Sequence, residues 1–270
     1  MLVDKAINKR SASLRTACKL FNISRQGYHY KAKAADDDYK TLLQALAHQY
    51  PKYGYWKLYY LMRNQEHQVN HKRIYNLYKE LKLQMRRKTK KRVIAVEAKP
   101  LAIPNQPNET WSIDFMTDTL TSSKRFRTLN VIDDFNREAL AIEAATSITG
   151  LRLTRMLDKV AYCRGYPKAI QCDNGPELRS KALAAWAKKH GITILFIQPG
   201  KPTQNAYIER FNGTYRREIL NAYLFKSLAQ VQEITNQWLE EYNKIRPHAS
   251  LGHLPPRQFA EKTLLLGVGK

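Results

Sequence analysis

The sequence predicts an α/β domain with a mixed five-stranded sheet and flanking helices, preceded by an all-α region of helix-turn-helix type. Three patterns indicate this. The first part of the chain shows only amphipathic helical periodicity, residues 110–145 show three strand patterns in series, and helix and strand alternate after that. Strands in series followed by alternation are typical of a mixed sheet with helices on both faces. With 270 residues and 43% hydrophobic residues, the chain can form more than one buried core.

Residues 14–33 predict two short helices around a turn at Asn22, with Ser24 as the N-cap of the second helix. The second helix carries side chains that can contact bases and phosphates: Arg25, Tyr28 and His29. We therefore predict a first helix-turn-helix in residues 1–36. A plain helical hairpin is the alternative, and Gly27 inside the second helix favours it slightly.

Residues 37–92 predict a second helical DNA-binding module. Its expected helices are 39–49, about 55–64 and 71–82, with Asn70 as the cap of the last. Lys72 and Arg73 on that helix are expected to contact DNA. A basic run closes the module, with six charges in seven positions: Arg86, Arg87, Lys88, Lys90, Lys91 and Arg92. We expect the run to contact phosphates, and a merely solvated surface is the alternative.

Residues 93–108 are polar and contain Pro100, Pro104 and Pro107, which predicts a linker. A catalytic domain is expected over 109–222 and a C-terminal helical extension over 223–270. The elements expected there are strands 110–116, 126–134, 138–145, 169–173 and 192–198, and helices 149–164, 177–190, 205–221 and 227–245.

The charge distribution indicates a nucleic-acid partner. The net charge is +23, and residues 1–100 contribute 23 Lys and Arg against 7 Asp and Glu, a net of +16. No stretch is apolar enough to span a bilayer, so we expect no membrane association. The three cysteines form no CxxC pair, which suits a reducing cytoplasm.

Three carboxylates stand at the edges of predicted buried elements: Asp114, Asp173 and Glu209. Thirty-five residues separate Asp173 from Glu209. If the strands carrying the two aspartates are adjacent, both meet where the helix carrying Glu209 begins. Carboxylates at one point suit divalent cations and phosphodiester chemistry. Taken singly, Asp173 also fits a simple turn and Glu209 an exposed helical pair, and other acids compete: Asp118, Asp133, Asp134, Glu177 and Glu218.

Several long motifs occur in a characteristic order: Trp111–Phe115, Val131–Phe135, Cys172–Glu177, Gly200–Ala206, Ile208–Gly213 and Tyr242–His248. In this order the chain resembles retroviral-integrase-like transposases, in particular the second reading frame of the insertion-sequence-three family of bacterial elements. The D-D-35-E spacing of that family fits Asp173 and Glu209 without a gap. The resemblance extends over about residues 12–260.

The resemblance implies an RNase-H-like core and a transposase that cleaves the 3′ end of an insertion element and transfers the strand. Asp114, Asp173 and Glu209 are then the catalytic residues and hold two Mg²⁺ ions, with Mn²⁺ as a substitute. Side chains implied to contact the DNA end are Lys201, Asn205 and Arg216. The implied partners are terminal inverted repeats, target DNA, further copies of the chain and a product of an upstream overlapping frame. The implied location is the bacterial cytoplasm, at the nucleoid.

Two other functions stay open on the sequence alone. One is a nuclease of the same fold that hydrolyses DNA and never joins it. The other is a non-catalytic helix-turn-helix regulator with a decayed core, which the presence of all three acids disfavours.

Overall fold

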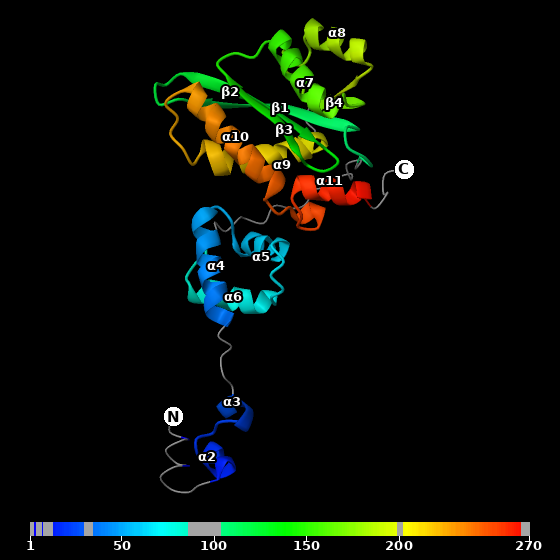
Figure 1. Ribbon diagram of the computed structural model, residues 1–270. Helices are drawn as coiled ribbons and strands as arrows, with labels where there is room; N and C mark the ends of the chain where they lie inside the picture. The colour runs from blue at the N-terminus through cyan, green and yellow to red at the C-terminus, as the bar shows by residue number, and fades with distance from the viewer. Residues whose placement is uncertain are drawn as a thin grey trace. The chain divides into compact units, whose positions relative to one another are not determined.

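The computed structural model describes Val3, Ile7 and residues 13–29, 35–85, 104–198 and 202–265 (Figure 1). The predicted basic run 86–92 and Lys201 lie outside these residues. Contacts divide the chain into two units, residues 1–58 with 69–85 and residues 59–68 with 86–270.

The first unit begins with the short helices α2 (Leu14–Leu20) and α3 (Arg25–His29). The Ser13 hydroxyl accepts a hydrogen bond from the Thr16 amide, and the Ser24 hydroxyl accepts one from the Gly27 amide at 2.9 Å. Both helix starts are therefore capped, as serine at these positions predicts. A small apolar cluster joins Ala17 and Cys18, and Tyr28 packs against it.

Three further helices follow: α4 (Ala35–Gln49), α5 (Tyr55–Asn64) and α6 (His71–Glu80). α4 starts earlier than its apolar pattern predicts, because Asp36, Asp37 and Asp38 in its first turn complement the positive end of the helix dipole. The predicted cap of α6 is present, since the Asn70 side chain accepts from the Lys72 amide at 2.8 Å.

The second unit contains the mixed five-stranded sheet that the sequence predicts. Its strands are β1 (Thr110–Thr119), β2 (Arg125–Asp133), β3 (Ala139–Ala145), β4 (Ala169–Cys172) and β5 (Thr193–Phe196). They lie in the order β3-β2-β1-β4-β5. β1 pairs antiparallel with β2, and β2 with β3, whereas β4 runs parallel to β1 and β5.

Helices cover both faces of the sheet (Figure 1). The helices after β3 are α7 (Gly150–Arg164), α8 (Lys181–His190), α9 (Ala206–Tyr215), α10 (Leu228–Lys244) and α11 (Pro256–Leu265). Trp111, Ile113 and Ile170 belong to one core with α7 and α8, while Phe126 and Ile132 belong to a second core with α9 and α10. The two faces of the sheet therefore supply two separate cores.

Two predicted helices of the second unit differ most from the observed ones. The predicted helix 177–190 begins only at Lys181, after a turn, because the Ser180 hydroxyl caps it by accepting from the Leu183 amide. The predicted helix 205–221 consists of a 3₁₀ turn (Pro202–Asn205), α9 and a π-helical turn (Arg216–Leu220). In that last turn the Asn221 amide donates to the Arg216 carbonyl, five residues back, at 2.8 Å.

Side chains of α10 occupy hydrogen-bonding groups along the outer edge of β3. Gln232 accepts from the Ala144 amide at 3.0 Å and donates to the Ile142 carbonyl at 2.9 Å. Asn243 accepts from the Ala139 amide at 2.9 Å and donates to its carbonyl at 2.8 Å. Two amide side chains thus stand in for part of a neighbouring strand.

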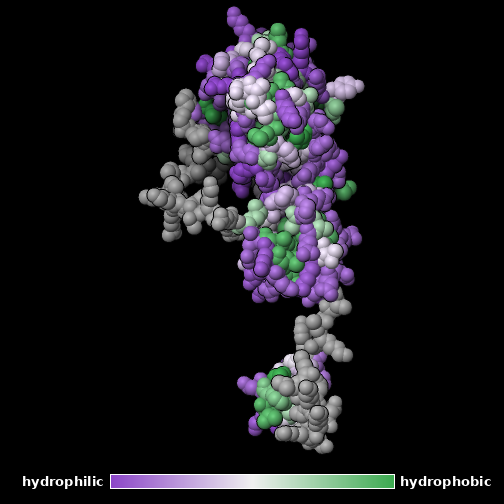
Figure 2. Space-filling model, turned by 90° about the vertical axis from the view of Figure 1, so that its left-hand side faces the viewer, coloured by the Kyte–Doolittle hydropathy of each residue, from purple (hydrophilic) through white to green (hydrophobic). Residues whose placement is uncertain are grey.

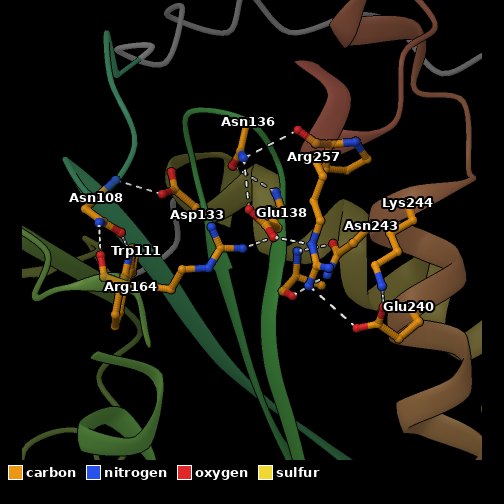
Figure 3. Close-up of polar contacts among 12 residues, drawn as sticks. Asn108, Trp111, Asp133, Asn136, Glu138, Arg164, Glu240, Asn243, Lys244 and Arg257 are labelled. Carbon is orange, nitrogen blue, oxygen red and sulfur yellow. Dashed lines mark hydrogen bonds and ion pairs between the residues drawn. The ribbon is translucent and has the colours of Figure 1, made fainter. Parts of the chain in front are cut away.

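The Glu138 side chain connects the C-terminal helix α11 to the sheet (Figure 3). This buried carboxylate follows the β2–β3 turn and accepts from Arg164 at the end of α7 and from Arg257 of α11, the latter at 3.1 Å. Asn136 donates to Glu138 at 3.1 Å. One carboxylate therefore connects three elements that are distant in sequence.

On the face shown in Figure 2, hydrophilic side chains cover most of the described surface, with smaller hydrophobic areas among them. Within the described residues, no helix has the length and apolar character needed to cross a membrane.

Candidate active site

Asp114 and Asp173 lie on neighbouring strands at the same level. Ser112 of β1 pairs with Gln171 of β4 in a parallel register, so two residues further Asp114 stands beside Asp173. Side chains two residues apart share a face, and neighbouring strands are about 4.8 Å apart. The adjacency of the two strands, which was the condition for the aspartates to meet, is therefore fulfilled.

That face is the one covered by α9. Asp114 Oδ2 accepts a hydrogen bond from Asn212 Nδ2 of α9 at 2.7 Å. Glu209 lies three residues before Asn212 in the first turn of α9 and is exposed. Residues three apart share a helical face, so Glu209 lies on the side of α9 that meets Asp114.

The negative charges of Asp173 and Glu209 act on the carboxylate of Asp114. Burial, with further contributions from the negative charges of Asp173 and Glu209, raises the pKa of Asp114 to about 6, against hydrogen bonds from Phe115 and Asn212 that lower it. Although Glu209 is exposed as a residue, partial desolvation of its carboxylate raises its pKa. A cation placed among these groups would counter both effects.

The carboxylates are not gathered into a finished metal site. No three His, Cys, Asp or Glu side chains in the described part of the chain lie close enough to hold a metal ion. Asp173 Oδ1 accepts from the Gly175 amide at 2.9 Å, and Asp114 Oδ1 accepts from the Phe115 amide at 2.8 Å. In both aspartates, therefore, one carboxylate oxygen is bonded to the local backbone.

Each competing acid also has a partner. Three form ion pairs, namely Asp118 with Arg216, Glu177 with Arg127 and Glu218 with Arg246. Asp133 accepts from two backbone amides, and Asp134 accepts from the Ser112 hydroxyl. Among the residues that the structure describes, Asp114, Asp173 and Glu209 form no ion pair, which distinguishes them from Asp118, Glu177 and Glu218 but not from Asp133 and Asp134.

Asn212 is a site residue that the sequence reasoning missed. It is buried, its Oδ1 accepts from Asn130 Nδ2 at 2.6 Å, and its Nδ2 donates to Asp114. β2 and α9 thus fix the carboxylate of β1 through one amide. The available signal was an amide residue one helical turn after Glu209.

The predicted DNA contacts have different surroundings. Arg25, His29 and Lys72 are exposed, and Tyr28 is half-buried against the small N-terminal cluster. Arg73 donates to Asp36 at 2.5 Å and lies over the ring of Tyr39. Two residues flank α9: Asn205 is 3% exposed, and Arg216 donates to Asp118 and to the Thr117 carbonyl, both at 2.8 Å.

The buried carboxyl group of Asp134 should make the stability of the folded protein depend on pH. Burial raises its pKa from 3.8 to about 7, and it is 3% exposed. A raised pKa means that the folded state binds the proton more tightly, so this group lowers stability as pH rises from about 4 to about 7. Replacement Asp134→Asn should therefore stabilise the protein above about pH 7, by at most about 4 kcal/mol, and much less below about pH 4.5. Urea unfolding of both proteins at the two pH values tests this, and an equal difference at both would contradict it.

Comparisons with known protein families and relatives identify the two kinds of domain. Family models described as integrase core domain match residues 104–202 and 190–256, and an HTH-like domain matches residues 34–91. An insertion element IS407 uncharacterized 31.7 kDa protein of Burkholderia multivorans is 45% identical over 257 residues, covering 94% of this chain and 92% of that protein. The putative transposase InsK for insertion sequence element IS150 of Escherichia coli is 26% identical, covering 88% of this chain and 89% of InsK.

A solved structure supports the fold. The simian T-cell lymphotropic virus intasome, in complex with PP2A regulatory subunit B56 gamma, contains a chain that matches with a TM-score of 0.50 and 16% identity. The match covers 80% of this chain and 73% of that one. The predicted RNase-H-like fold class is thus confirmed, and the chain belongs to the insertion-element transposases that carry an integrase core domain behind an HTH-like region.

Proposed function

We propose that this transposase cleaves the 3′ end of its element and joins the freed 3′-OH to another DNA strand. Asp114, Asp173 and Glu209 are the proposed catalytic residues and hold two Mg²⁺ ions, for which Mn²⁺ can substitute. One observation supports this above the others. Among the described residues these three carboxylates form no ion pair, and the negative charges of Asp173 and Glu209 act on Asp114, whereas Asp118, Glu177 and Glu218 are each paired with an arginine.

The donor set fits hard divalent cations, which prefer carboxylate oxygens. When bound, such ions stabilise negative charge on the attacking and leaving oxygens of an in-line displacement. The chain itself contributes geometry. Asp114 is held by Asn212 and the backbone, Asp173 follows the end of β4, and Glu209 lies in the first turn of α9. Partial burial opposes the ionisation of Asp114, so cation binding favours the charged form.

The proposed DNA contacts fall into two groups. Duplex DNA is bound by the helical modules through Arg25, Tyr28, His29, Lys72, Arg73 and the basic run 86–92. The DNA end is positioned beside α9 by Lys201, Asn205 and Arg216, for which Arg216 must leave its ion pair with Asp118. Proposed module boundaries lie at residues 36, 92, 108 and 222.

The proposed partners follow from the reaction. Terminal inverted repeats and target DNA are the substrates, and two element ends call for at least two copies of the chain. A product of an upstream overlapping frame is a further proposed partner, with the reaction taking place at the nucleoid in the bacterial cytoplasm.

A strand-transfer assay separates joining from hydrolysis. The protein is incubated with Mg²⁺ and a labelled duplex bearing the ends of its own element, and products longer than the substrate are measured. Joined products support the proposal. Nicked products alone would indicate a nuclease of the same fold, and Mg²⁺-independent binding without cleavage would indicate a regulator.

The basic run gives a prediction about binding. Replacement of Arg86, Arg87, Lys88, Lys90, Lys91 and Arg92 by glutamine should weaken binding to all duplexes alike. The slope of log affinity against log salt should become shallower by roughly 0.9 for each phosphate that the protein no longer neutralises. Titrations at several salt concentrations measure this slope, and an unchanged slope would show that the run does not contact phosphates.

A further inference from the structure

α6 presents an exposed polar face to which no role beyond Lys72 has been given. Lys72, Tyr75, Asn76 and Lys79 are all exposed, and their spacing places them on one side of the helix. The opposite side is formed by buried residues: Ile74, Leu77 and Tyr78. The buried side fixes the helix in its module, so the exposed face is held in a defined orientation.

Aromatic side chains border this face. Trp56 of α5 is 52% exposed and stacks on His71, with ring centroids 6.0 Å apart and an interplanar angle of 23°. Tyr55 donates to the His71 carbonyl at 2.5 Å, and its ring lies 5.0 Å from that of Tyr75. Tyr75 in turn lies under Lys79, whose Nζ is 4.9 Å from the ring centroid. Basic and aromatic groups therefore alternate on one surface.

Asn76 is the chemically informative member of the face. Its amide is exposed and makes no hydrogen bond within the described residues, so it is available to a ligand. An asparagine amide can donate to adenine N7 or accept from its N6 amino group, and it can do both at once in the major groove. Arg73, by contrast, is turned toward Asp36 and Tyr39 of α4.

The alternative reading helix, α3, is less suited to the same task. It has only five residues, and its Tyr28 packs against the N-terminal cluster. α6 has ten residues and is about 15 Å long, and an α-helix of ordinary diameter fits the major groove, which is about 12 Å wide.

We propose that α6 is the base-reading helix of this transposase, with Asn76 contacting a base edge in the major groove. Lys72 and Lys79 contact the flanking phosphates, and the rings of Trp56 and Tyr75 pack against the sugar-phosphate backbone. This inference rests on the proposed binding of duplex DNA by the helical modules, and it names the helix and the side chain that give sequence preference.

The test uses a pool of short duplexes with a randomised core, in buffer without divalent cations. Full-length protein selects its preferred duplexes, and Asn76→Ala protein is then compared on the selected sequence and on single-base-pair variants of it. We expect wild-type protein to prefer the selected base pair at one position by about 5- to 150-fold, and Asn76→Ala protein to show no such preference at this position alone. The Lys79→Gln change should weaken binding to all duplexes equally.

Two controls make the result specific. Gln44→Ala removes an exposed amide from α4 and should leave the preference intact, as should Gln26→Ala on α3. Thermal unfolding should be the same for every variant, because all these side chains are exposed. Because the assay needs no cleavage, it reports on α6 even if the chain should prove unable to join DNA.

Several outcomes would overturn the proposal. Asn76→Ala protein with an unchanged preference at every position excludes Asn76 as a base contact. Loss of preference in Gln26→Ala protein instead assigns base reading to α3. If the wild-type protein enriches no sequence, α6 does not read bases, and its exposed face binds a protein partner or phosphates alone.

Discussion

Asp114→Asn, Asp173→Asn and Glu209→Gln proteins should each lose DNA cleavage and joining while binding duplex DNA nearly as well as the wild type. Each change keeps the size of the side chain and removes one negative charge from the proposed cation site. Loss of a group that stabilises charge in the transition state lowers rates by roughly 10²–10³-fold or more. Phosphate contacts elsewhere supply most of the DNA affinity, so binding should persist.

Strand transfer and duplex binding are measured side by side on the same protein preparations. Glu240→Gln is the matched control, because it removes one carboxylate from an exposed position on α10 without touching the site. If any of the three variants joins DNA at a near-wild-type rate, that residue does not belong to the catalytic site. If binding disappears together with joining, the residue acts on DNA affinity or folding instead.

The second large effect is expected at Asn212. Asn212→Ala removes the hydrogen bond that fixes Asp114 Oδ2, so Asp114 should sample orientations that hold a cation poorly. Loss of such an orienting partner typically lowers metal affinity or activity by about 10–100-fold. The measurement is the joining rate as a function of Mg²⁺ concentration, with recovery expected at high Mg²⁺ because Asp114 itself remains.

The Asn130→Ala variant tests whether Asn212 orients Asp114 or only stabilises the fold. Asn130 lies opposite Asp114 in the β1–β2 pairing and donates to Asn212, but among the described residues it makes no side-chain hydrogen bond to Asp114, so its removal should lower joining less than Asn212→Ala does. For Asn212→Ala protein, the joining rate could instead be reduced by the same factor at every Mg²⁺ concentration, with a lower unfolding temperature. That result would mean that Asn212 serves only the fold.

Much of the fold follows from local sequence patterns. The three strands in series and α7 were predictable because apolar residues recur there with the period of each element. The start of α8 was missed because Glu177, Leu178 and Arg179 favour helix, although the capping hydroxyl comes only at Ser180. The π-helical turn after α9 was missed because one extra residue in a turn barely alters an apolar pattern.

The candidate site was only partly predictable for a different reason. Sequence spacing singled out Asp114, Asp173 and Glu209, but their approach depends on the pairing of β1 with β4, which local patterns do not specify. The contact between Asn212 and Asp114 joins residues 98 positions apart, and the ion pair of Arg216 with Asp118 spans the same separation. Contacts of this kind emerge only from the folded arrangement.

The amide side chains on β3 limit how copies of this protein can associate. An open edge strand is a template on which a strand of another chain can pair. On β3, hydrogen-bonding positions at Ala139, Ile142 and Ala144 are already taken by α10 of the same molecule. A second copy therefore cannot continue the sheet through these positions unless α10 first detaches. At this edge of the sheet, a complex that brings two element ends together has to be built from side-chain surfaces or held together by the DNA.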